Sequence, residues 1–210
     1  MSDDLEQAYA ALANGRVPAS WSSVSFASLK ALGPWIAELG DRVAFVRRWL
    51  RRGPPSCFNL AGFFFPQGFL TGALQRHARK YRLAINDLEL ECQVMHGASA
   101  LPSVADGVLV DGLHLEGGRW DARRALMTDP GPRDRVQRMP PLALVPRLQQ
   151  QQECDSTSYT CPVYKTQARA GALSTTGIST NFVVAVALPT DREAQHWVMS
   201  GTALVCSLSE

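Results

Sequence analysis

The sequence predicts an α+β fold: an N-terminal helical subdomain (residues 1–84) followed by an incomplete antiparallel β-barrel of about six strands (residues 85–210). Two changes of pattern support this division. Up to about residue 84, apolar residues recur every three or four positions, the period of one helix face. After Asn86 they alternate with polar residues, the period of a strand with one solvated face. A hydrophobic content of 46% in 210 residues is enough for a sizeable core.

Three helices are expected in the first part. The first begins at Ser2, whose hydroxyl can cap it, and ends at Asn14-Gly15. A short helical turn is expected over residues 25–32. The second long helix is expected over residues 34–52, because five residues spaced by three or four form one apolar face. These residues are Trp35, Leu39, Val43, Val46 and Leu50.

The third helix is expected over residues 66–81, directly after three consecutive phenylalanines. Pro66 suits the first position of a helix, where its missing N–H would be unpaired anyway. Phe63, Phe64 and Phe65 then form a buried wedge at the join between the two parts of the sequence. Because three consecutive side chains cannot all point one way, we expect at least one ring to face away from the helical core.

The second part reads as short strands joined by turns. Asp111-Gly112 is typical of a hairpin, and residues 129–141, with four prolines, are expected to be irregular. Residues 149–158 are polar and of low complexity, which predicts a loop. The strands are expected over residues 88–94, 108–115, 142–146, 159–165, 180–188 and 196–207, the last with a possible bulge at Gly201.

Interface candidates lie mostly in the helical part. The end of the second long helix is rich in arginine, and the sequence leaves two interpretations open: a solvated, helix-capping cluster or a docking surface for an acidic partner. Most tryptophans are expected in the core, and an interface role for one of them stays open. The structural and interface candidates are Trp21, Trp35, Phe63, Phe64, Phe65, Pro66, Arg47, Arg48, Arg51 and Arg52.

Charge and composition argue against several classes of partner. A net charge of +2 is too small for an obligatory nucleic-acid or anionic-membrane partner. The longest apolar stretch is broken by polar residues, Pro66 and glycines, so no membrane span is expected. The five cysteines are an odd, widely spaced set, and the first residues are acidic where a signal peptide is basic and then apolar. Reduced thiols and a cytoplasmic location are therefore expected.

Motifs for catalysis, cofactors and metals are not expected either. The sequence contains no phosphate-binding glycine motif with the required spacing, and its cysteines and histidines lack the paired spacing of a zinc site. The most suggestive stretch for chemistry is residues 173–181, where Ser174 and Ser179 precede His196. It does not match the nucleophile elbow, and serines before a strand usually form local turn bonds. We expect no catalytic, cofactor-binding or metal-binding residue.

Several long strings, in order along nearly the whole sequence, resemble the C-terminal domain of dynein heavy chains of the axonemal type. Alanine or serine often stands in that family where this sequence has Gly68. The matching strings are GFFFPQGFLTG at residues 62–72, ARKY at 78–81, Arg119-Trp120, CPVYKT at 161–166, LSTTG at 173–177, STNFV at 179–183 and His196-Trp197.

The resemblance implies a non-catalytic module at the end of a large motor protein. Such a domain packs on the ring of AAA+ modules of the same heavy chain and tunes force and coupling. ATP hydrolysis and microtubule binding belong to other parts of that motor, which works in the axoneme of a cilium or flagellum. Two alternatives from the sequence stay open: an independent partner- or ligand-binding β-barrel, and a hydrolase that uses Ser174 or Ser179 with His196.

Overall fold

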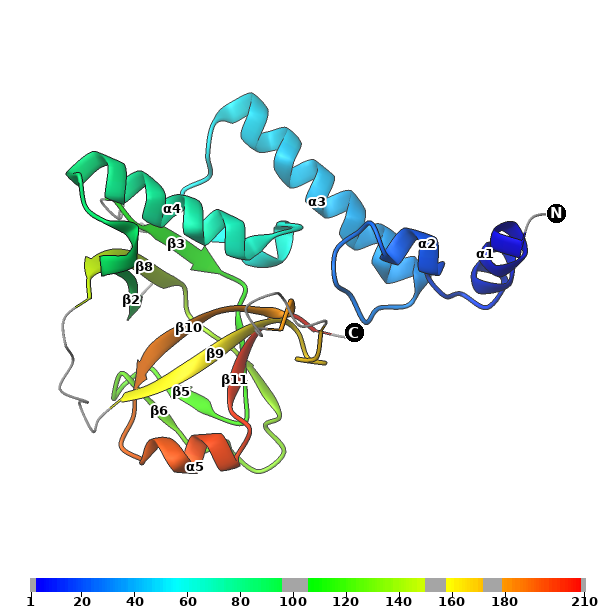
Figure 1. Cartoon of the computed structure of the whole chain (residues 1–210). Helices are drawn as coiled ribbons and strands as arrows, with labels where there is room; N and C mark the ends of the chain where they lie inside the picture. The colour runs from blue at the N-terminus through cyan, green and yellow to red at the C-terminus, as the bar shows by residue number, and fades with distance from the viewer. Residues whose placement is uncertain (1–2, 96–105, 150–157, 172–178, 209–210) are drawn as a thin grey trace.

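The computed structural model describes residues 3–95, 106–149, 158–171 and 179–208, which form a mixed α+β fold (Figure 1). Five α-helices and two 3₁₀ helices, η1 and η2, lie in these ranges. They are α1 (Asp3–Ala13), α2 (Ala19–Ser22), α3 (Leu32–Arg52), η1 (Leu60–Gly62), α4 (Pro66–Tyr81), η2 (Ile85–Asp87) and α5 (Ala194–Met199).

The ends of the long helices follow local chemistry. Gly15 has φ +64° just after α1, and Gly53 has φ +83° just after α3, a conformation that glycine adopts without strain. Pro66 is the first residue of α4, as predicted. The turn predicted over residues 25–32 is wrong. The short helix of this region lies earlier instead: it is α2, which directly follows Pro18 in an extended conformation.

The predicted apolar face of α3 is also wrong in its direction. Of its five residues only Trp35 is buried, whereas Val43, Val46 and Leu50 are 39%, 43% and 82% exposed. The face that packs inward is shifted around the helix and carries Glu38, Arg42, Phe45 and Trp49 with Trp35. Aromatic rings and one buried ion pair therefore take the place of the aliphatic stripe.

Eleven short strands lie in the described ranges and form three sheets. They are β1 (Phe58–Asn59), β2 (Leu88–Val94), β3 (Val108–Asp111), β4 (His114–Glu116), β5 (Arg119–Asp121), β6 (Leu126–Thr128), β7 (Val136–Arg138), β8 (Leu142–Leu148), β9 (Ser158–Thr166), β10 (Phe182–Pro189) and β11 (Ala203–Ser207). The sheets have the orders β1-β3-β8-β2, β10-β9-β11-β4-β7 and β5-β6.

The sheets differ in two ways from the predicted barrel. Most pairs are antiparallel, but β1 pairs with β3 and β11 with β9 in parallel. The edge strands β2 and β10 pack beside one another, yet no ladder joins the two larger sheets within the described residues. The described strands thus form no closed barrel, and the incomplete barrel is not confirmed.

Several local predictions in the second part are wrong for identifiable reasons. Asp111-Gly112 does not close a hairpin, because β3 and β4 belong to different sheets. The strand predicted over residues 142–146 does not end at Pro146, because β8 continues to Leu148 and Pro146 pairs with Leu90 of β2. β3 pairs with β8 only up to Leu144, so the missing N–H of Pro146 interrupts no second ladder.

The strand predicted over residues 196–207 begins only at Ala203, with β11, and its first residues belong to α5. In α5 Trp197 is fully buried and its indole N–H donates to Thr190 Oγ1 at 2.9 Å.

The main core lies between the sheets and α4. Large aliphatic side chains from β3, β4, β8, β9, β10 and β11 are almost completely buried there, with Leu60 and Leu70 from the helical part. α1, at the far end of the helical part in Figure 1, contributes no buried residue to this core as described. Burial therefore falls steeply from the sheets toward the N-terminal helix.

Candidate functional site

The helical part is joined to the rest of the molecule through the buried Arg42 side chain of α3. Its guanidinium donates to the Phe63 carbonyl at 2.8 Å and to Glu38 at 2.5 Å. It also lies 3.8 Å from the centroid of the Phe26 ring. Burial lowers the pKa of Arg42, and the hydrogen bond and charge of Glu38 oppose this shift. One cation thus connects α3, the preceding loop and the phenylalanine run.

Aromatic stacking continues this joint toward the N-terminus. Trp35, which is buried, stacks on Phe26 at a centroid distance of 5.4 Å and on Trp21 at 6.1 Å. Trp21 itself is 41% exposed, so it forms the outer surface of the stack. The edge of Phe64 meets Phe26 at 5.8 Å. The loop between α2 and α3 is therefore held by rings, although it has little regular structure.

The three consecutive phenylalanines lie in three different environments. Phe63 is half-buried and stacks on Phe69 at 4.3 Å, inside a cluster that also holds Trp49 and Phe58. Phe64 and Phe65 are 48% and 64% exposed. The predicted buried wedge is therefore wrong for Phe64 and Phe65, because only Phe63 turns into the aromatic cluster. The expectation that the three rings cannot share one direction is confirmed.

The outermost of these rings, Phe65, lies over two neighbours. Lys165 of β9 places its ammonium 5.8 Å from the ring centroid. A β-carbon added at Gly68 would lie 2.7 Å from Cε1 of Phe65 and closer still to Cδ1. Glycine at this position therefore leaves room for the ring to lie back on the first turn of α4.

The first turn of α4 is also tied directly to the second large sheet. The Gln67 side-chain amide donates to the Phe182 carbonyl at 2.5 Å and to the Thr180 carbonyl at 3.2 Å. These carbonyls lie at the start of β10, an edge strand whose backbone acceptors would otherwise face solvent. Arg42 and Gln67 together hold the phenylalanine run between α3 and β10.

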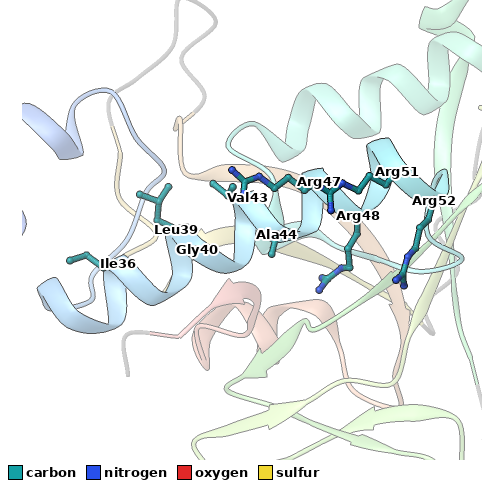
Figure 2. A pocket seen from close by; sticks show the side chains of 9 residues that line it. All are labelled: Ile36, Leu39, Gly40, Val43, Ala44, Arg47, Arg48, Arg51 and Arg52. Atoms are coloured by element: carbon teal, nitrogen blue, oxygen red, sulfur yellow. The ribbon is translucent and has the colours of Figure 1, made fainter.

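The outer face of α3 is an open surface that combines aliphatic and arginine side chains. Figure 2 shows these side chains following one another along the helix around a shallow pocket. The four predicted arginines are exposed, and none has an ion-pair partner among the described residues. We call this surface the α3 outer face; it is lined by Ile36, Leu39, Gly40, Val43, Ala44, Arg47, Arg48, Arg51 and Arg52.

A second pocket opens between the end of α3, the start of β3 and α4. It is lined by the aromatic residues Trp49, Phe58 and Phe69 and by Gly68 and Gly72 of α4. The cavity volume is about 610 Å³, which is within the usual range for small-ligand sites. This pocket is the feature that best fits the ligand-binding alternative.

Of the hydrolase constellation the described residues test only Ser179 with His196, and these two are not brought together. Ser174 lies outside the described residues, and Ser179 precedes β10, where its hydroxyl accepts from the Asn181 N–H. His196 lies beyond the other end of β10, in α5, and contacts Asp129 at 2.5 Å. The eight residues of β10 separate the two side chains by about 25 Å of extended backbone.

The cysteines offer little reactivity in the described part of the molecule. Cys57, Cys92, Cys161 and Cys206 are free thiols. Burial raises the pKa of Cys92, Cys161 and Cys206 to about 12, so thiolates are scarce at neutral pH.

Metal ligation and membrane insertion find no support in the described residues. No group of three or more metal-ligating side chains comes together in them. None of their helices is both long and apolar enough to cross a membrane.

Sequence reasoning missed three residues that hold the joint: Phe26, Arg42 and Gln67. Arg42 lies on the same helix as the four candidate arginines, but it is 4% exposed. The spacing of Glu38 and Arg42, four residues apart on one helix, is a signal for an ion pair that could have separated it from them. Nothing local in the sequence indicates the partners of Phe26 or Gln67, because these contacts depend on the tertiary fold.

Comparison with known proteins agrees with this architecture. Residues 1–206 match the family model that describes the C-terminal domain of the dynein heavy chain. The chain is 43% identical to human dynein axonemal heavy chain 6 over 232 aligned residues, covering 100% of this chain and 6% of that protein. It is 41% identical to human dynein axonemal heavy chain 1, covering 99% of this chain and 5% of that protein. For human dynein axonemal heavy chain 12 the identity is 42%, with 100% of this chain and 7% of that protein covered.

The chain thus spans only 5–7% of the length of these curated relatives, while almost all of its own residues are aligned. A match of the family model over residues 1–206, with relatives that are 41–43% identical, identifies the family. The chain belongs to the family of C-terminal domains of dynein heavy chains, and these relatives are axonemal heavy chains.

Proposed function

We propose that this chain is a non-catalytic regulatory domain that packs on the AAA+ ring of an axonemal dynein heavy chain and tunes ATP-driven motility on microtubules. In this proposal ATP hydrolysis and microtubule binding belong to other parts of the heavy chain. The domain works in the axoneme of a cilium or flagellum, with the ring modules of its own heavy chain as partners.

The observation that carries the proposal is the unequal burial of the helical part. Its inner side is fixed by Arg42 and Gln67, whereas apolar side chains on α1 and α3 remain exposed, including Leu5, Tyr9 and Leu50 at 59%, 73% and 82%. Exposed apolar residues gathered on one part of a small domain favour a docking role.

A domain that regulates force by packing on a ring must keep its shape under load, and the contacts at the joint favour such stiffness. We propose that residues 1–84 and 85–210 are the two parts of the domain, joined rigidly at the phenylalanine run, with the sheets forming an open, barrel-like body. The packing of β2 beside β10 favours such a body. The contacts of Arg42 and Gln67 make the phenylalanine run the element whose stiffness couples the two parts.

The test uses the full heavy chain with single substitutions on the proposed docking surface. Leu50→Glu places a charge on an 82% exposed side chain of α3, where it should weaken ring contact without disturbing the fold. Met199→Glu on α5, where the side chain is 77% exposed, is the matched control. We expect Leu50→Glu and a deletion of residues 1–210 to change stall force, velocity or ATPase rate, with Met199→Glu unchanged.

The two candidate functions predict different outcomes. Unchanged motility in both the deletion and Leu50→Glu would contradict a regulatory role for the domain. The second candidate, an independent ligand-binding domain, is favoured by the aromatic pocket around Trp49. It predicts that filling this pocket by Gly72→Trp abolishes ligand binding and leaves motility intact.

A further inference from the structure

The α3 outer face has two properties that α3 itself does not explain. Its apolar residues are exposed, with Ile36 at 51% and Val43 at 39%, and Gly40 in its middle has open space where a side chain would be. A glycine inside a helix costs about 1 kcal/mol relative to alanine, yet here it permits another backbone to approach closely. The arginines at the end of the face have no ion-pair partner in the part of the molecule that the structure describes.

α1 carries the complementary features. Leu5, Tyr9 and Leu12 follow one another at helical spacing and are 59%, 73% and 38% exposed. The first turn is acidic, with Asp3, Asp4 and Glu6, and none of the described α1 residues is buried. An acidic helix with an exposed apolar stripe therefore precedes, in the sequence, a helix with exposed apolar residues and a basic end.

The connection between α1 and α3 places the end of α1 where the helix could extend along the α3 outer face. The Leu32 N–H at the start of α3 donates to the Gly15 carbonyl at 2.9 Å, so the end of α1 is tethered beside the beginning of α3. Gly15 has φ +64°, and a β-carbon added there would meet no other atom within 4 Å. Because glycine has wider backbone freedom than other residues, Gly15 is the residue of this connection best suited to a change in the direction of α1. α1 has 11 residues and is about 16 Å long, the distance that separates Ile36 from Arg47 along α3.

We propose that α1 folds back about Gly15 and packs antiparallel against the α3 outer face. In this arrangement Leu12 lies against Ile36, Ala8 against Gly40 and Leu5 against Val43. The acidic first turn of α1 then comes within one helical turn of Arg47 and Arg48. The closed form covers an apolar surface that the open form leaves exposed, so α1 regulates access to α3.

Disulfide trapping in the 210-residue chain tests the contact. Leu5→Cys combined with Val43→Cys should cross-link within one molecule at least about tenfold faster than Leu5→Cys with Asp41→Cys, because proximity raises the effective concentration. Asp41 is exposed on another side of the same helix and gives the matched control. Because the protein has five cysteines of its own, the linked pair is identified by peptide mapping.

Charge exchange tests the polar half of the contact. Arg47→Glu with Arg48→Glu should slow trapping a few-fold, as expected for exposed ion pairs, and adding Asp3→Arg with Asp4→Arg should restore the rate. Equal trapping rates at positions 43 and 41 would overturn the proposal. A cross-linked product of twice the mass of one molecule would overturn it too, because the occupant of the face would then be a second copy.

The α1 contact and docking on the ring can be tested separately. Leu50 lies beyond the reach of α1, so Leu50→Glu tests ring docking and leaves the α1 contact intact. If positions 43 and 41 trap at equal rates while Leu50→Glu changes motility, only the α1 contact fails. If position 43 traps faster but deletion of the domain leaves motility unchanged, only the ring-docking proposal fails.

Discussion

Arg42 is the residue on which the attachment of α3 depends most directly. Arg42→Met removes the bonds to Glu38 and to the Phe63 carbonyl and leaves a carboxylate in a largely buried position. Removal of one partner from a buried ion pair costs about 3–5 kcal/mol. We expect a loss near 3 kcal/mol in the free energy of unfolding, because Lys30 remains 3.3 Å from Glu38.

Urea denaturation measures this loss, with Arg52→Met as the control. Arg52 is exposed and has no partner among the described residues, so its replacement should change stability by less than about 0.5 kcal/mol. The double variant Glu38→Gln with Arg42→Met should recover part of the loss. Equal effects of the Arg42 and Arg52 substitutions would mean that the buried pair does not hold α3.

Gly68 should be coupled to Phe65. In the native protein, Gly68→Ala brings a β-carbon to 2.7 Å from Cε1 of the Phe65 ring, which must then move away. In a Phe65→Ala background the same change meets no ring and should stabilise α4 by about 0.5–1 kcal/mol through helix propensity. A double-mutant cycle measured by thermal unfolding should give a coupling of about 1 kcal/mol. Additive effects would show that the ring does not need this space.

His114 gives the folded protein a pH dependence in the mildly acidic range. Burial lowers its pKa, the nearby Arg138 lowers it further, and Asp111 acts in the opposite direction. The unfolded state then binds more protons than the folded state, so stability falls as pH drops through the ordinary histidine value of 6.5. Replacing His114 by Gln should flatten the unfolding free energy between about pH 7.5 and 5.5. An unchanged slope in denaturation at several pH values would contradict this assignment.

At the scale of elements, local chemistry determined the long helices and the longest strands. Pro66, Gly53 and the strict alternation of Leu88–Val94 mark boundaries that the structure confirms. The errors arise where tertiary contacts override the pattern. α5 forms because Trp197 reaches Thr190 in the core, and Pro146 is tolerated because one side of β8 is free at its level.

The direction of the α3 face could not be predicted from periodicity for a related reason. Both sides of α3 carry apolar residues at helical spacing, so the period identifies a helix without deciding which side is buried. The aromatic side faces inward because Phe26, Phe58 and Phe63 supply rings that pack against Trp35, Phe45 and Trp49. The interface role of the arginines on α3 stays a prediction, and Arg42, which anchors this helix, was missed.

The end of α3 provides a prediction about helix termination. Gly53 has φ +83° and ψ 177°, a region that is almost exclusive to glycine, so Gly53→Ala should destabilise the protein by about 1–3 kcal/mol. Gly72→Ala is the matched control, because Gly72 lies inside α4 with no other atom within 4 Å of the added carbon. It should stabilise by about 0.5–1 kcal/mol. Thermal unfolding distinguishes the opposite signs, and a loss in both variants would contradict the explanation.

At the scale of the whole molecule, burial predicts a gradient of local stability. The sheets bury their side chains almost completely, α3 is held mainly by one face, and α1 has no buried residue in the structure as described. Because local opening requires the loss of buried contacts, amide exchange should be fastest in α1, intermediate in α3 and slowest in β3, β8, β9 and β11. Hydrogen-exchange mass spectrometry of the native protein measures this order.

Arg42→Met should then change exchange in one part of the gradient only. Since the joint holds α3 against the phenylalanine run, the substitution should speed exchange in α3 and in the first turn of α4 and leave β11 protected. Gln67→Ala should act on the other side of the joint, at the start of β10, where two carbonyls lose their donor. If either substitution instead accelerated exchange evenly over the whole molecule, the helical part and the sheets would form a single cooperative unit without a distinct joint between them.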